Sequence, residues 1–469
     1  MAKSQQEERI KQNDERENYI LTLLGVIKKF YPSLFNDFNG TDPRNKSYIT
    51  YTMRYLLTIL FFKYALSIVS MRSMTNAFER SAVIANLTLF GGMKGCLLLP
   101  SAHAINNFLM ILPLSFLWTL RKTIITTLIR SKRLDKGRFK KMFAVIIDAT
   151  QTYGGSIPIN LKCTKRVHGR GKENEHTTFH RNVLEAKLWL VGTPFVFSIC
   201  TEFIENDPGA TENDKRSKEK IKQDCELAAF NRLVVKLHAD YPKLPIVLLA
   251  DSLYISNNVF NICNKYGWKF MIRYKTGSAP SIQEYVDTAI QGNDLITIPD
   301  QKEYKGIGYY LGVPYYNNVL NYVQATVIDD DPKKTQNLKW VTNIPITYRV
   351  EYILDVITLG RGRWKIENQG FNRQKKWLGV LEHLCCWHDQ ALKNHYLMIQ
   401  IADIFLTLLD MTENLQEEKK EYRNPEYKRI IRTFQQRKDD LRDGLKHIQM
   451  DQCGSWKWIK ALVEEPVAA

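Results

Sequence analysis

The chain has 469 residues, with 66 Lys and Arg against 49 Asp and Glu, so its formal net charge is +17 at pH 7. Apolar residues make up 44% of the chain and aromatic residues 11%, which excludes a disordered or fibrous protein. At roughly 150 residues per domain, the length predicts two to four domains and excludes a single small module. The positive charge favours a polyanionic partner, nucleic acid before an anionic membrane surface.

The compartment is predicted from the cysteines and the apolar segments. Eight cysteines without CxxC spacing favour reduced thiols over a disulfide framework. The hydrophilic segment 1–18 lacks the apolar core of a secretory signal. The longest apolar segments, 56–70 and 108–120, contain Lys63 and Pro113 and are shorter than the roughly 20 residues of a membrane span. We therefore expect a cytoplasmic protein without membrane contact, in which these segments form buried helices.

Residues 1–141 are predicted to form a helical DNA-binding region. Apolar residues recur at helical spacing through 19–30 and 51–69. A basic run with a single acid, Asp135, ends the region at 121–141. This run is either a solvated helix with a linker or a phosphate-contacting surface, and the overall charge favours contact. The candidate DNA-binding residues in it are Lys132, Arg133, Arg138 and Lys140.

The pattern changes to alternating strands and helices after Met142, which predicts a mixed α/β sheet with helices on its faces through residues 142–276. Strands are expected at 143–148, 184–191, 194–204, 245–251 and 268–275, and helices at 215–240 and 256–266.

Three further segments complete the predicted organisation. Residues 277–346 look like a β-rich insertion, because short runs of Tyr, Val and Ile alternate with Gly, Pro, Asn and Asp. Residues 347–412 return to helical patterns, interrupted near Gly360 and Gly362, and would form the second part of the α/β core. Residues 413–469 are charged and predict a helical C-terminal region.

Three acids stand out as candidate catalytic residues. Asp148 and Asp251 each end an apolar run, and sites in open α/β sheets form at the carboxyl ends of strands. Either acid alone is equally well explained as a helix cap or a turn residue. Glu367 follows Arg363 by four residues on one helix face, which on its own is an ordinary surface pair.

The segments VIIDATQT, LPIVLLADSLY and RGRWKIENQGFNRQKKWLG together resemble DDE transposases of bacterial insertion sequences, in the branch with a β-strand insertion between the second Asp and the Glu. The resemblance covers roughly residues 143–409. It implies a ribonuclease H-like core in which Asp148, Asp251 and Glu367 form the catalytic and metal-binding triad.

The resemblance also implies the chemistry and the partners. Three carboxylates would hold two Mg²⁺ ions, with Mn²⁺ as a substitute, for in-line phosphoryl transfer. Water would cleave the transposon end, and the freed 3′-hydroxyl would attack target DNA. The partners would be double-stranded DNA, as terminal inverted repeats and target, and a second protomer in the DNA complex. The protein would then work in the prokaryotic cytoplasm, associated with the nucleoid when bound to DNA.

The chain departs from the family motif at two positions. The family usually has Tyr three residues before the Arg and Lys seven after the Glu, where this chain has Gly360 and Gln374. Arg363 matches the motif and is a candidate DNA-binding residue, as are the cations beside Gln374, which are Arg373 and Lys375. On a regular helix both are rotated away from the Glu367 face, so Lys375 replaces the family lysine only if the helix is irregular.

Two other readings remain open. A zinc site is an alternative for Cys163, His168, His176 and His180, but their spacing fits no common finger and the basic surroundings favour a DNA-facing loop. For His383, Cys385, Cys386 and His388, core packing and capping are favoured over a metal site, because neighbouring residues on a helix point apart. For the whole chain, the rivals to a transposase are a catalytically inactive or repurposed DNA-binding protein and a metal-dependent nuclease without strand transfer.

Overall fold

The computed structural model describes residues 19–206, 224–328, 335–427, 429 and 432–464. The chain divides into two compact units. The first comprises Met1–Ser131, Gln151–Arg181 and Phe371–Ala469, and the second comprises Lys132–Thr150 and Asn182–Gly370. This division follows the packing of the elements and differs from the five consecutive segments expected from the sequence.

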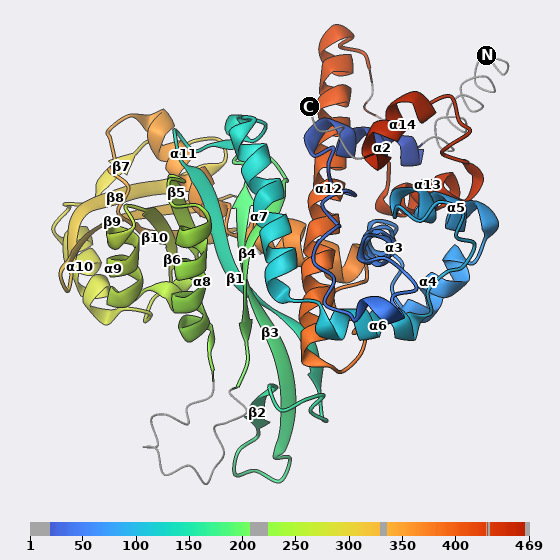
Figure 1. The fold of residues 1–469 in the computed structure, drawn as a ribbon. Helices are drawn as coiled ribbons and strands as arrows, with labels where there is room; N and C mark the ends of the chain where they lie inside the picture. The colour runs from blue at the N-terminus through green and yellow to red at the C-terminus, as the bar shows by residue number, and fades with distance from the viewer. Residues whose placement is uncertain (1–18, 207–223, 329–334, 428, 430–431, 465–469) are drawn as a thin grey trace. The chain divides into compact units, whose positions relative to one another are not determined.

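The first unit is mainly helical. Its helices are α2 (Tyr19–Phe30), α3 (Met53–Ala65), α4 (Met71–Phe78), α5 (Ser81–Phe90), α6 (Ala102–Ile111), α7 (Leu114–Arg130), α12 (Asp389–Arg423), α13 (Phe434–His447) and α14 (Trp456–Val463). The long helix α12 packs against α2, α3, α6 and α7, and α13 packs against α2 and α5 (Figure 1). The helical segments from the two ends of the chain therefore share one core.

Both long apolar segments form helices in this unit, as expected. Helix α3 begins after Thr52, whose side chain accepts a hydrogen bond from the backbone N–H of Tyr55, and all its residues are buried. Pro113 separates α6 from α7, which meet at an angle of 88°. Within the described residues, no single helix is both long and apolar enough to cross a membrane.

The sheet contains ten strands and is mixed, which confirms the α/β class. The strands are β1 (Phe143–Gly155), β2 (Thr164–His168), β3 (His176–Trp189), β4 (Val196–Ile204), β5 (Ile246–Ala250), β6 (Lys269–Tyr274), β7 (Ile296–Ile298), β8 (Tyr304–Tyr315), β9 (Asn318–Val327) and β10 (Gln336–Thr342). Their order is β2-β3-β1-β5-β6-β10-β9-β8-β7, with β4 paired to β3. Strands β1, β5 and β6 are parallel, whereas β10 runs antiparallel to β6.

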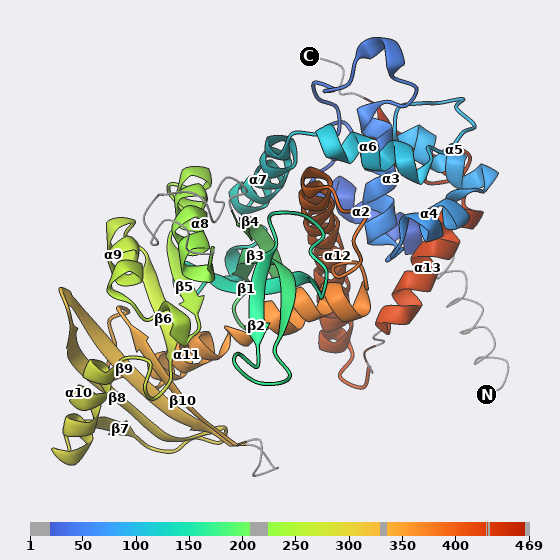
Figure 2. The same ribbon diagram turned by 90° about the horizontal axis from the view of Figure 1, so that it is seen from below.

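Four helices accompany the strands of the second unit: α8 (Glu226–Asp240), α9 (Asn257–Lys265), α10 (Pro280–Gln291) and α11 (Val350–Arg361). Helix α8 packs on β4, and α9 and α11 both contact β6 and β9. Figures 1 and 2 show α8 and α9 side by side next to β5 and β6. The first part of the helix expected at 215–240 lies outside the described residues, and the described part begins at Glu226.

The expected β-rich insertion is part of the main sheet. Strands β7 to β10 form an antiparallel series, and β10 pairs with β6 in a register that sets Thr342 opposite Met271. The segment also contains α10, which the sequence pattern did not predict. Residues 277–346 therefore extend the α/β sheet sideways and do not close a sheet of their own (Figure 2).

Candidate active site

Asp148 lies in β1, and Asp251 directly follows β5, the parallel strand that pairs with β1. The register of β1 and β5 pairs Phe143 with Ile246 and continues to Ile146 with Leu249. Asp148 follows two residues after the last of these pairs on β1, and Asp251 directly follows Ala250, the last residue of β5. Strand β1 itself continues to Gly155, so Asp148 lies within it and not at its end as expected. The two carboxylates are close enough for the negative charge of Asp251 to raise the pKa of Asp148.

Asp251 also caps a turn. It is the N-cap of a short 3₁₀ helix, Ser252–Tyr254, and its carboxylate accepts a hydrogen bond of 2.9 Å from the backbone N–H of Leu253. The capping role considered for this acid is therefore real. It orients the carboxylate without using all of its acceptor positions, because an ionised carboxylate has about four.

Glu226, the first residue of α8, joins these two acids. The hydroxyl of the buried Tyr254 donates a 2.7 Å hydrogen bond to the Glu226 carboxylate, which ties the start of α8 to the turn after Asp251. Burial raises the pKa of Glu226, and the charge of Asp251 acts in the same direction. The sequence reasoning missed Glu226, because an acid in a first helical turn is common and its neighbours come from distant strands.

Asp148 is largely buried within the acidic group. Burial raises its pKa to about 7. The negative charges of Glu226 and Asp251 raise this pKa as well, whereas the positive charge of Arg363 lowers it. Mutual repulsion between half-buried carboxylates is the arrangement that a bound cation relieves.

Arg363 supplies the positive charge in this group. Its Nη1 lies 3.3 Å from the Asp148 carboxylate, and both side chains are largely shielded from solvent. A second guanidinium, that of Arg273 on β6, is nearby: burial lowers its pKa to about 10, and repulsion from Arg363 contributes to the lowering. Arg363 is therefore the cation that contacts the carboxylates, and Arg273 lies near Arg363.

Two glycines at the end of α11 allow the helix to pack closely on the sheet, so that Arg363 lies beside Asp148. A Cβ atom at Gly362 would lie 1.9 Å from the ring of Trp189, and one at Gly360 would lie 2.6 Å from the ring of Trp340 and from the methyl group of Met271. Position 360 is where the family usually has Tyr. No such side chain fits here, because the tryptophan of β10 already fills the space.

Glu367 lies apart from this group in its interactions. It is exposed, in a π-helical segment Ile366–Phe371 that follows α11, and it forms no hydrogen bond or ion pair with any described residue. Among the residues that the structure describes, no three His, Cys, Asp or Glu side chains are close enough to hold one metal ion. The structure thus brings together Asp148, Asp251 and Arg363, with Glu226 in addition, whereas the part of Glu367 in the triad stays a prediction.

The cations predicted after α7 are mostly exposed. Lys132 and Arg133 lie on the surface in the turn that follows the helix. Arg138 pairs with Asp135 at 2.7 Å, and exposed Lys140 pairs with Asp355 at 2.7 Å. Exposed ion pairs of this kind contribute little stability, so Arg138 and Lys140 could each leave its acid and bind a phosphate.

The cations predicted after Glu367 belong to the first unit and are paired there. Arg373 is buried and forms ion pairs with Asp403 and Asp410, which does not favour a DNA contact. Gln374 is fully buried and donates a 2.7 Å hydrogen bond to Asp403, so a lysine would be costly at this position. Lys375 pairs with Glu382 at 3.1 Å. The segment is π-helical, which is the irregularity that a substitute lysine at position 375 would require.

No family model and no curated protein matches this chain. Function is therefore inferred from the residues of the site. The residues of the site all lie within the second unit. They are Asp148, Glu226, Asp251, Arg273 and Arg363.

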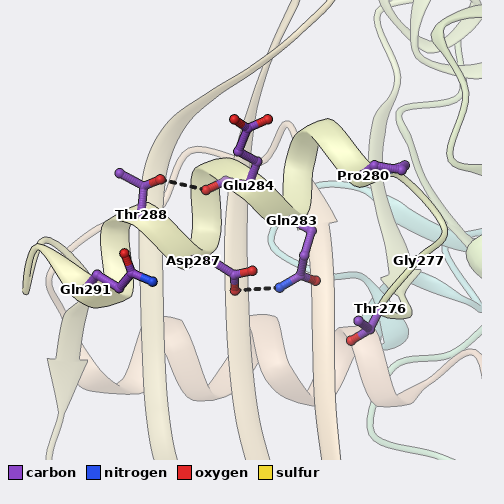
Figure 3. Close-up of a pocket in the computed structure, with 8 residues that line it drawn as sticks. All are labelled: Thr276, Gly277, Pro280, Gln283, Glu284, Asp287, Thr288 and Gln291. Carbon is purple, nitrogen blue, oxygen red and sulfur yellow. Dashed lines mark hydrogen bonds between the residues drawn. The ribbon is translucent and has the colours of Figure 1, made fainter.

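A separate hollow of about 570 Å³ lies along α10. Figure 3 shows its lining, in which the Gln283 amide donates a 2.6 Å hydrogen bond to Asp287 and the Thr288 hydroxyl donates one to the Glu284 carbonyl. The lining residues are Thr276, Gly277, Pro280, Gln283, Glu284, Asp287, Thr288 and Gln291. None of them belongs to the acidic group.

Proposed function

We propose that this chain is a DNA transposase that catalyses metal-dependent cleavage at transposon ends and strand transfer into target DNA. The observation that carries the proposal is that Asp148 in β1 lies within electrostatic reach of Asp251, which directly follows the neighbouring parallel strand β5. The carboxyl edge of parallel strands is where sites of α/β proteins form. The partners would be terminal inverted repeats and target duplex, held by two protomers.

The strand order supports a ribonuclease H-like core. Strands β4, β3, β1, β5 and β6 are neighbours in that order, α8 connects β4 to β5, and α9 connects β5 to β6. Strands β7 to β10 are inserted in the chain between Asp251 and Glu367. This position agrees with the transposase branch that the sequence resembles.

The residues fit a divalent metal by their donor chemistry. Carboxylate oxygens are the ligands that Mg²⁺ and Mn²⁺ prefer. Burial raises the pKa of Asp148, and the negative charges of Glu226 and Asp251 add to this, so a bound cation would favour its ionised form. Asp148 and Asp251 would hold the metal, and the side chain of Glu226 or Glu367 would have to move closer to them to become a further ligand. When bound, the metal would supply charge neutralisation and activation of water for phosphoryl transfer.

The cations beside the acids suit the phosphates of a DNA strand. Arg363 would exchange its pairing with Asp148 for a phosphate once a metal neutralises that carboxylate. Arg361 donates a 2.9 Å hydrogen bond to the Tyr304 hydroxyl and keeps further donors available. Burial lowers the pKa of Lys365, and the positive charge of Arg361 lowers it further. A phosphate near these two cations would offset their mutual repulsion and would attract both.

The test is Mg²⁺-dependent release of a marker flanked by the native ends on a plasmid. We expect excised or joined products from the wild type and none from Asp148→Asn or Asp251→Asn. Glu303→Gln, which neutralises an exposed acid elsewhere in the second unit, should behave as wild type.

The outcomes separate the rivals. Binding of the ends by the wild type without cleavage would favour an inactive or repurposed DNA-binding protein. Cleavage that never yields joined products would favour a nuclease. Full activity of both aspartate variants would refute the assignment of the site.

A further inference from the structure

The antiparallel pairing of β2 with the first part of β3 makes a two-stranded ribbon. We call residues 164–180 the basic ribbon; they lie wholly within the first unit. Figure 1 shows β2 beside β3. The register sets Thr164 opposite His180 and His168 opposite His176. Even-numbered residues of both strands therefore share one face.

This face carries three histidines held in a chain of hydrogen bonds. The Thr178 hydroxyl lies 2.8 Å from His168 Nε2 and 2.7 Å from His180 Nε2. His180 Nδ1 is 2.8 Å from the Gln151 side-chain oxygen, and the ring of His176 stacks on that of His168 at 4.8 Å. The rings are therefore ordered before any partner binds.

The histidines do not form a site with Cys163. The thiol is buried in an apolar cluster with Ile159 and Leu392, against which Phe179 and Cys385 pack. This cluster fixes the base of the ribbon. Ion pairs add to the anchoring.

The charged side chains at the base of the ribbon form ion pairs, whereas the cations towards its tip form none with the residues that the structure describes. At the base, Lys162 and Arg181 both pair with Asp389, at 3.0 and 2.6 Å. Towards the tip, Arg166, Arg170 and Lys172 are exposed and form no ion pair with any residue in the described ranges. The base is held by paired charges, whereas the tip presents unbalanced positive charge.

The two acids of the loop offset this charge only in part. Glu175 accepts a 2.7 Å hydrogen bond from the backbone N–H of Gly171, which directs its carboxylate back into the loop. Glu173 is exposed. Three arginine and lysine side chains therefore outnumber the two acids, and the neighbouring Lys165 adds a fourth exposed cation.

We propose that the basic ribbon binds the sugar–phosphate backbone of double-stranded DNA by entering the major groove. That groove is about 12 Å wide and admits a two-stranded ribbon. Arginine, lysine and threonine side chains supply most contacts to phosphates. This DNA contact is separate from the acidic group and does not depend on catalysis.

The histidine face makes this binding dependent on pH. Burial lowers the pKa of His180, and repulsion from Arg166 and His168 contributes. A phosphate on this face would oppose that repulsion and favour protonated rings. The charged and titratable groups of the ribbon and its loop are Lys165, Arg166, His168, Arg170, Lys172, Glu173, Glu175, His176 and His180. Only the two glutamates among them would weaken DNA binding.

The test uses the full chain and fluorescence anisotropy with a labelled DNA duplex of scrambled sequence. Arg170→Gln/Lys172→Gln should weaken binding about tenfold or more and make the slope of log K against log salt less steep by about 2. Lys243→Gln/Lys302→Gln removes the same charge from exposed positions of the second unit and should leave both values unchanged. Equal losses in the two variants would overturn the proposal.

A second comparison addresses the histidine face. Wild-type binding should tighten from about pH 7.5 to about pH 5.5, the range in which histidine titrates. His168→Gln/His176→Gln/His180→Gln should lose most of this dependence. If its thermal melt shows misfolding, His176→Gln serves instead, because that side chain is exposed. A pH dependence identical to wild type in folded variants would contradict the role of this face.

Discussion

The guanidinium of Arg363 lies 3.3 Å from the carboxylate of Asp148, although 215 residues separate them in the chain. This contact joins the segment after α11 to strand β1. It is also the main influence that keeps Asp148 from being still harder to ionise, because burial and two other acids act in the opposite direction. Substitution of Arg363 therefore reports on the electrostatics of the site.

Arg363→Gln should destabilise the metal-free protein by about 1 kcal/mol above pH 7, because a largely shielded carboxylate loses its partner. Arg363→Lys, which keeps the charge but not the fork of donors, should lose less. Urea unfolding at pH 8 without metal measures both. Equal stability of wild type and Arg363→Gln would show that the pair contributes nothing.

Asp148→Asn should stabilise the protein without metal. The pKa of Asp148 is raised from 3.8 to about 7 in the folded state, so the folded chain holds more protons than the unfolded chain between these values. Stability from this group is therefore lost as pH rises from about 4 to about 7, and a neutral side chain avoids that loss. Thermal melting at pH 8 should show a higher Tm for Asp148→Asn.

Added Mg²⁺ should then reverse the order. A metal that binds only the folded chain raises Tm, and the wild type should gain more than Asp148→Asn. The control is EDTA, which should restore the metal-free order. An equal Mg²⁺ effect on the two proteins would argue against metal binding at Asp148.

Glu226→Gln and Glu367→Gln should differ in their effects on stability. Because burial raises the pKa of Glu226, neutralising it should raise the Tm of the metal-free protein. Glu367 is exposed, so its substitution should change stability by less than about 0.5 kcal/mol. Melting curves with and without Mg²⁺ show which variant loses the response to metal. That residue is the further ligand, and loss in neither would restrict the site to the two aspartates.

The strand positions of the candidate site were predictable, because an apolar run followed by an acid is a local pattern. Asp148 and Asp251 were identified from such runs, and their strands pair as an open α/β sheet requires. Glu226 was not identified, because its importance comes from Tyr254 and from strands that lie far away in the chain.

The assignments after Glu367 depended on packing that the sequence does not display. Arg373 and Gln374 resembled surface positions near a motif, yet both face α12, where Asp403 accepts hydrogen bonds from them. Gly360 looked like a departure from the family motif. Its reason is the ring of Trp340, a residue in a strand that could not be placed beside α11 from local patterns.

Gly362→Ala should destabilise the protein by about 1 to 3 kcal/mol, because its Cβ would overlap the ring of Trp189 and force the helix away from the sheet. Gly25→Ala is the matched control. Gly25 lies within α2 with no heavy atom near its Cβ position, so alanine there should stabilise by about 0.5 to 1 kcal/mol. Chemical denaturation of both variants gives the comparison, and a neutral Gly362→Ala would contradict the tight packing.

Lys63→Met should stabilise the protein near neutral pH. Lys63 is buried in α3, where its Nζ donates a 2.9 Å hydrogen bond to the Val69 carbonyl, and burial lowers its pKa from 10.5 to about 7. Between these values the unfolded chain binds more protons than the folded chain, so wild-type stability rises with pH. Methionine removes the burial cost of the charge, which is largest below pH 7.

The advantage of Lys63→Met should therefore shrink as pH approaches about 10, where the lost hydrogen bond to Val69 outweighs what remains of the burial cost. Urea titrations at three pH values measure the trend. Lys94→Met, at an exposed position, should show no such dependence on pH. A constant difference between wild type and Lys63→Met across the range would mean that Lys63 keeps its charge in the core, compensated by the backbone around it.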